Sequence, residues 1–277
     1  MQARLLGCAL AKVLLVCTVA PLYAQDATNS NDYSALIAAG SKALAQNRLR
    51  DAARAFQRAV DLNPSSVKAH EGLGVALFRQ ISAGNVRPSA DTDVVERAEA
   101  HLTQAVDLSP SASAPRLQLS GFEAFLAERS PDADEKAGRY KKSQDLLREV
   151  LSLEPGKPEI YLRLANLQRD EFGPALQQAK ARFPKNGGPI PDVNLRRELQ
   201  RQYAALVEDA ITNAQRASEV NGSSQAPLLL LSRLFRERAL IRDTPEQYTT
   251  DMHTAADWQR QFLAAGGHLD HEPGARR

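Results

Sequence analysis

The sequence predicts an all-α solenoid, a curved stack of helix pairs. Three similar six-residue segments end with proline: AVDLNP at 59–64, AVDLSP at 105–110 and VLSLEP at 150–155. Proline lacks a backbone N–H and clashes with the preceding turn, so each segment ends one helix and the next can begin there. Self-similarity at intervals of a few tens of residues is typical of stacked units that bury their apolar faces against their neighbours.

The composition is that of a soluble, folded chain. Of its 277 residues, 43% are hydrophobic and 25% are charged, which leaves enough apolar material for a sizeable core. Two of the 35 basic residues, Arg4 and Lys12, lie within the first 24 residues, so 33 basic residues balance 33 acidic ones in the rest. This balance argues against nucleic acid or an anionic membrane as a partner.

Residues 1–24 are expected to be a secretory signal peptide. They combine the basic residues Arg4 and Lys12, a short apolar run at 13–20 and the small residue Ala24 at the predicted cleavage site. The apolar run is too short to span a bilayer. We therefore predict cleavage after Ala24 and export to the periplasm or the extracellular space.

Both cysteines, Cys8 and Cys17, lie inside this leader. The exported chain would then contain no thiol, which excludes disulfides, thiol catalysis and cysteine metal sites. Each cysteine also partly matches a lipid-attachment site, but Cys8 comes before any apolar segment and Cys17 follows the bulky Val16. Contact with a membrane is expected only if one of them carries a lipid.

The first unit is expected at 33–66, after a disordered stretch at 25–32. Its large and small residues resemble the pattern of the tetratricopeptide repeat, a helix–turn–helix unit of 34 residues. The matching positions are Leu36, Ala39, Gly40, Ala43, Ala52, Phe56, Ala59 and Pro64. The chain is thus similar to exported bacterial proteins of this family, and the resemblance implies a right-handed superhelical solenoid in which Phe56 fills the space between neighbouring units.

Two longer units are expected at 67–112 and 113–157. Their final prolines follow the preceding ones by 46 and 45 residues, well above the family period. The surplus falls between the paired helices, and we assign it to long loops at Ser82–Asp93 and Arg129–Gly138. Both loops would project from the same end of the stack.

A fourth, degraded unit is expected at 158–186, because Gly173 and Pro174 interrupt its middle. A helical cap is then predicted at 187–267. It contains a long helix at 192–220 with apolar residues at steps of three or four, and an apolar helix that opens at Pro227.

The last helix of the cap begins at a capping box formed by Thr244 to Gln247, and it stops at Gly266. Residues 268–277 are expected to be a disordered tail.

In the family that the chain resembles, the first helix of each unit lines a concave groove. Here that orientation implies a groove with an apolar centre and polar ends, which suits an amphipathic helix or an extended hydrophobic peptide. The implied partner-binding residues are Ile37, Ser41, Leu44, Lys68, Glu71, Val75, Phe78, Gln118, Phe122, Phe125, Leu162, Asn166 and Arg169.

These features predict a non-catalytic scaffold that binds another protein or a peptide, in the cell envelope or outside the cell. The sequence has no Gly-rich phosphate loop, no Gly-x-Ser-x-Gly elbow and no His-Glu-x-x-His motif, so we expect no enzyme, cofactor, metal site or small-molecule substrate. The alternative is a structural subunit that docks into a larger assembly through its two long loops, with its groove filled by its own C-terminal helices.

Overall fold

The computed structural model describes residues 32–84, 92–220 and 224–268. The predicted signal peptide, nearly all of the stretch at 25–32, the middle of the Ser82–Asp93 loop and the tail after residue 268 lie outside these ranges. The described residues form ten α-helices and no strand. The helices are α2 Tyr33–Ala45, α3 Leu49–Leu62, α4 Val67–Ser82, α5 Thr92–Leu108, α6 Ser113–Arg129, α7 Ala133–Leu153, α8 Pro158–Ala181, α9 Val193–Val220, α10 Gln225–Leu240 and α11 Pro245–Ala264.

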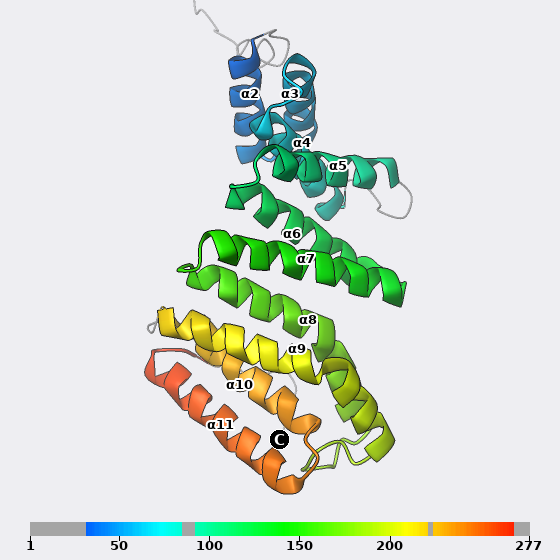
Figure 1. Cartoon of the computed structure of the whole chain (residues 1–277), viewed down its shortest axis with the longest axis vertical. Coiled ribbons are helices and arrows are strands. Elements are labelled where there is room, and N and C mark those ends of the chain that lie inside the picture. The colour runs from blue at the N-terminus through cyan, green and yellow to red at the C-terminus, as the bar shows by residue number, and fades with distance from the viewer. Residues whose placement is uncertain (1–31, 85–91, 221–223, 269–277) are drawn as a thin grey trace, which may run out of the picture.

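The ten helices form five pairs that are stacked along the long axis of the molecule (Figure 1). Within a pair, helices that follow each other in the chain make the most extensive contacts: α2 with α3, α4 with α5, α6 with α7, α8 with α9, and α10 with α11. The second helix of each pair then packs against the first helix of the next. The predicted all-α solenoid is confirmed.

Phe56 shows how the first two pairs fit together. Its ring lies between two glycines, Gly40 on α2 and Gly72 on α4, and a Cβ atom added to Gly72 would lie only 2.4 Å from the ring. Because the two glycines have no side chains, the ring fits between their helices, as close packing of helices requires. Phe56 therefore fills the space between neighbouring units, as the sequence predicts.

The loop predicted at Arg129–Gly138 is wrong. Helix α6 ends at Arg129 and α7 begins at Ala133, so the surplus residues lengthen α7 to 21 residues. Asp132 caps α7 by accepting a hydrogen bond from the backbone N–H of Glu135 at 2.7 Å. The segment is rich in strong helix formers and has acidic residues in its first turn, which outweighs the single Gly138.

The break predicted at Gly173–Pro174 is also wrong, because α8 is one helix of 24 residues with Pro174 inside it. Gly173 lacks the Cβ atom that a following proline normally repels. Phe172 and Leu176 are both fully buried, so burial on either side of the proline favours a continuous helix. Helix α8 pairs with α9. The boundary predicted at residue 187, between the fourth unit and the helical cap, therefore falls between the two helices of one pair.

The C-terminal helices agree with the sequence. The long helix predicted at 192–220 is α9, and α11 begins with the predicted capping box, in which Thr244 and Gln247 bind each other's backbone. Helices α10 and α11 form the fifth pair and cover the C-terminal end of the stack (Figure 1). None of the helices in the described ranges is both long and apolar enough to cross a bilayer.

Candidate interaction surface

The first helices of the pairs approach one another along one side of the stack. Helix α4 contacts both α2 and α6, and α8 contacts α10. Among the described residues, the second helices α3, α5, α7, α9 and α11 make no comparably extensive contact with each other. Helices on the inner side of a curved stack lie closer together than those on the outer side. The first helices therefore line the concave face, as the resemblance implies.

The middle of this face carries a concave apolar patch, which consists of Val75 and Phe78 on α4 and Phe125 on α6. All three side chains pack against the core and remain partly accessible. The rings of Phe78 and Phe125 meet edge to face, with 5.3 Å between their centroids. The guanidinium of Arg129 lies 3.6 Å from the centroid of the Phe125 ring, a cation–π contact at the edge of the patch.

Phe122 does not belong to this accessible surface. Its side chain is 0% exposed and contacts the ring of Phe78 from below, at 5.3 Å between centroids. Leu119 and Leu126 are buried on the same side of α6, at the spacing of three to four residues that places side chains on one helix face. Phe122 thus supports the patch from the core, and its prediction as a contact residue is wrong.

Glu71 lies one turn before Val75 on the same face of α4. Its side chain is half-buried, and burial raises the pKa of its carboxyl group above the usual value. Within the described residues, no ion pair or side-chain hydrogen bond involves Glu71. Since a buried charge is costly unless it is paired, this carboxylate is suited to receive a cationic group of a ligand.

The other predicted residues of the first three pairs lie around the patch. Ile37 and Leu44 on α2 are partly buried against the core. Ser41 and Lys68 are exposed, and Gln118 is half-buried on α6. The structure thus places an apolar centre beside polar side chains, which agrees with the expected distribution.

The fourth pair contributes less to such a surface. Arg169 donates hydrogen bonds to Glu237 of α10, with 2.7 Å between Nη2 and Oε1 and 3.0 Å between Nε and Oε1, so it links two helices of this chain. Burial raises the pKa of Glu237, and the guanidinium of Arg169 opposes that rise. Asn166 donates to the carbonyl of Leu162 in its own helix, while Leu162 is partly buried. Arg169 is therefore already engaged.

The described C-terminal helices leave the concave apolar patch uncovered. The extensive contacts of α9, α10 and α11 are with α8 and with one another, and α4 and α6 are not among their extensive contacts. Only the far end of the concave face, at α8, is packed against α10. This arrangement does not favour the alternative in which the chain fills its own groove.

Several cavities lie on the other side of the stack. Four of them occur where the second helices of neighbouring pairs diverge: between α3 and α5, α5 and α7, α7 and α9, and α9 and α11. None of the four is lined by a predicted groove residue. These outer clefts could not be predicted from the sequence, because the spacing of the second helices depends on the curvature of the whole stack.

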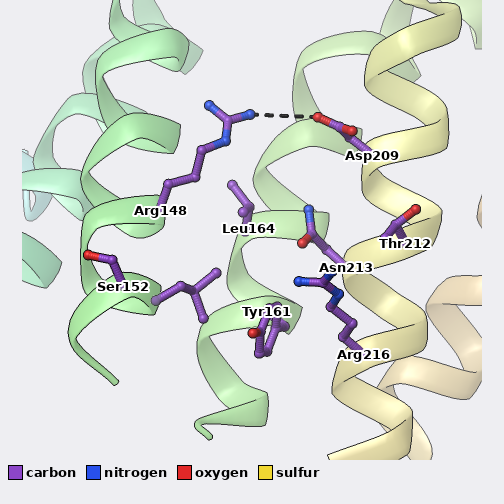
Figure 2. Close-up of a pocket in the computed structure, with 9 residues that line it drawn as sticks. Arg148, Ser152, Tyr161, Leu164, Asp209, Thr212, Asn213 and Arg216 are labelled. Carbon is purple, nitrogen blue, oxygen red and sulfur yellow. Dashed lines mark ion pairs between the residues drawn. The ribbon is translucent and has the colours of Figure 1, made fainter. Parts of the chain in front are cut away.

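The cleft between α7 and α9 has a volume of about 400 Å³, and Leu164 of α8 belongs to its lining. Figure 2 shows the side chains that line it. Arg148 and Asp209 point toward each other across it, with 3.8 Å between Nη2 and Oδ2. The guanidinium of Arg216 lies 5.8 Å from the ring centroid of Tyr161. An ion pair of the chain itself thus bridges this cleft, and Arg216 is a second cation in its lining.

The described residues contain no group of three or more histidine, cysteine or acidic side chains that could hold a metal ion. One of their ionic clusters joins Glu99, Glu123, Arg139 and Lys142, in which cations face the carboxylates. Such a cluster links helices rather than presenting free ligands.

Comparison with known proteins supports the repeat assignment. Residues 37–85 match the family model of the tetratricopeptide repeat. A search of curated proteins gave no significant match.

Solved structures are similar in fold to most of the chain. The fragment of MamA from residue 41 to its end, from Desulfovibrio magneticus RS-1, is similar with a TM-score of 0.53 and 12% identity over 84% of this chain and 94% of that one. Another MamA crystal structure has a TM-score of 0.51 and 11% identity over 86% and 97%. YrrB, described as a TPR protein with an unusual peptide-binding site, has a TM-score of 0.50 and 12% identity over 89% and 99%. The fold predicted from the sequence, a solenoid of helix pairs like those of the tetratricopeptide repeat, is confirmed.

Proposed function

We propose that this chain is a non-catalytic scaffold that binds a peptide or an amphipathic helix of another protein on its concave face. The observation that carries the proposal is the concave apolar patch of Val75, Phe78 and Phe125, which the described helices leave uncovered. Solenoids use such extended concave surfaces for binding. The peptide-binding site named for YrrB is consistent with this use of the fold.

The chemistry of the surface defines the ligand. The aromatic rings of Phe78 and Phe125 would take aliphatic or aromatic side chains, and the unpaired carboxylate of Glu71 would take a lysine or an arginine one helical turn away. The bound segment is therefore apolar on one side and carries a basic residue at its edge. From Gln25 onwards 33 basic residues balance 33 acidic ones, a charge that is compatible with a polypeptide ligand.

A pull-down from the native host tests this proposal. We expect the wild-type chain to retain a partner that the Phe125→Glu variant loses, because a carboxylate at the patch cannot enter an apolar contact without losing its water. The matched control is Arg201→Glu on α9, an exposed position away from the concave face. Retention of the same partner by all three proteins, with unchanged melting temperatures, would contradict the proposal.

The proposal includes export of the chain. Its support is the basic, apolar and small-residue order of residues 1–24. N-terminal sequencing of the protein recovered from its native compartment is expected to begin at Gln25. A protein that retains the leader in the cytoplasm would contradict export but leave the binding surface unaffected.

A further inference from the structure

The outer cleft between α3 and α5 differs from the others in its charge. It is a cavity of about 650 Å³ whose rim carries three arginines, Arg50 and Arg54 on α3 and Arg97 on α5. Among the residues that the structure describes, its lining includes no carboxylate. The cleft between α7 and α9, by contrast, contains Asp209 paired with Arg148.

The three arginines are only partly neutralised from outside the cleft. Arg50 takes part in no ion pair among the described residues. Arg54 pairs with Asp51 at 2.5 Å, and Arg97 reaches Asp93 at 3.9 Å, where the two side chains are 44% and 81% exposed. Exposed pairs of this kind contribute about 0–1 kcal/mol, so a ligand carboxylate can replace them at little cost.

The orientation of the rim favours one ligand lying along the cleft. Arg50 and Arg54 are four residues apart on α3, so their side chains lie on the same face. Arg97 approaches from α5, and its Nη2 donates to Oε1 of Gln57 at 3.3 Å, which directs the guanidinium toward α3. Arginine side chains thus lie on both sides of the cavity.

Between these arginines the cleft has an apolar floor. Ala53 and Val94 are partly buried, and Leu77 of α4 is 5% exposed. This floor can cover one aliphatic side chain. The described part of the lining contains no aromatic side chain, so it offers no platform on which nucleic-acid bases could stack.

We propose that this cleft is a second binding site, which takes an acidic polypeptide segment with an aliphatic residue between its carboxylates. The arginines bind the carboxylates through charge-assisted hydrogen bonds, and the aliphatic side chain lies on Ala53, Leu77 and Val94. The site is on the opposite side of the stack from the concave apolar patch. The chain can then hold two polypeptides of different chemistry at once.

Fluorescence anisotropy with a labelled peptide tests this inference. The probe is Gly-Ser-Glu-Glu-Leu-Glu-Glu-Ser-Gly, titrated with the chain from Gln25 onwards at low and at physiological salt. We expect binding that weakens as salt rises. The double variant Arg50→Gln, Arg54→Gln should weaken it about tenfold, the combined effect of two rim charges.

The matched control is Arg197→Gln, Arg201→Gln. This pair has the same spacing of four residues on α9, and both positions are exposed. The control and the Phe125→Glu variant are both expected to bind the probe as the wild type does. Equal affinity of the cleft variant and the wild type would overturn the inference, as would loss of binding in Phe125→Glu, which would place the acidic peptide on the concave face.

Two changes in the probe peptide test which of its chemical groups the cleft binds. Replacing the four glutamates by lysines should abolish binding, and replacing the leucine by serine should weaken it. An oligonucleotide of equal charge that displaces the peptide and binds more tightly would overturn the choice of a polypeptide ligand. Since binding of this probe does not depend on the concave apolar patch, failure here leaves the proposed function standing, and the pull-down can fail without affecting this cleft.

Discussion

At the scale of single residues, the packing of Phe56 depends on the absence of two side chains. A Cβ atom on Gly72 would lie 2.4 Å from the Phe56 ring, which Gly40 confines on its other side. We expect Gly72→Ala to lower the free energy of unfolding by about 1–2 kcal/mol, since overpacking outweighs the helix propensity gained. Urea denaturation followed by circular dichroism measures the change.

The control for this substitution is Gly138→Ala in α7. Apart from its own helix backbone and its chain neighbours, no atom of the described ranges lies within 4 Å of a Cβ added there, and the position is exposed inside a helix. Its free energy of unfolding should rise by about 0.5–1 kcal/mol. If both substitutions shifted stability in the same direction, the account of Phe56 packing would be wrong.

The pair His70 and His101 gives the chain a pH-dependent contact between α4 and α5. Nε2 of His70 donates to the carbonyl of Pro64 at 2.9 Å, so Nδ1 of His70 accepts from Nδ1 of His101 at 3.0 Å. Burial, together with the nearby His70 and Arg97, lowers the pKa of His101 to about 4. Charging His101 is therefore disfavoured in the folded chain.

The sign of the effect follows from proton binding. Between pH 6.5 and about 4 the unfolded chain takes up a proton at His101 that the folded chain does not, so stability falls as the pH falls through this range. We expect the urea midpoint of the wild type to drop more between pH 7.5 and pH 5 than that of His101→Gln. Identical drops would show that His101 does not contribute.

At the scale of helices, a buried ionic cluster joins α5, α6 and α7. Glu123 is 0% exposed, and its carboxylate meets Lys142 at 2.6 Å and Arg139 at 2.9 Å. Lys142 also lies 2.6 Å from Glu99 on α5. Burial raises the pKa of Glu123, and the two cations oppose that rise.

Removing the two cations alone should destabilise the folded chain more than removing the two cations together with the carboxylate. The double variant Arg139→Met, Lys142→Met leaves Glu123 buried without a partner, and we expect it to lose about 3–5 kcal/mol of unfolding free energy. Adding Glu123→Met should restore most of that loss. A triple variant as unstable as the double one would contradict this view of the cluster.

Helix ends that depend on local signals were predictable from the sequence, whereas helix continuity that depends on distant contacts was not. Capping signals are local, so the box at Thr244 was predictable from four residues. The continuity of α8 through Pro174 was not, because it depends on the burial of Phe172 and Leu176 against later parts of the chain. The family period likewise suggested a loop before Gly138, where local helix propensity extends α7 instead.

At the scale of the whole molecule, the pairing of α8 with α9 predicts how the chain tolerates truncation. A chain that ends at residue 186 lacks α9, whose Val207 and Ile211 share a buried core with Leu176 of α8. We expect the backbone amides of α8 to lose their protection in this chain and to keep most of it in a chain that ends at residue 222. Hydrogen exchange measures both, and equal protection would contradict the pairing.

The proposed binding surface was predictable only in part. Val75, Phe78 and Phe125 could be placed on the concave face because the repeat pattern fixes which side of a first helix faces inward. The burial of Phe122 and the engagement of Arg169 by Glu237 could not be deduced, since both depend on neighbouring helices that are distant in sequence. The arginine cleft has a weak local signal, the spacing of Arg50 and Arg54, but Arg97 joins them only in the folded stack.

The most direct test of the central claim, a concave face open to a partner polypeptide, is site-specific photocrosslinking in the native host. A photoreactive residue replaces Phe125 in one chain and Arg201 in another. The account predicts a discrete adduct with one other polypeptide from position 125, none from position 201, and loss of the adduct when Val75→Glu is added. A crosslink from position 125 to residues 187–267 of the same chain, or equal adducts from both positions, would contradict it.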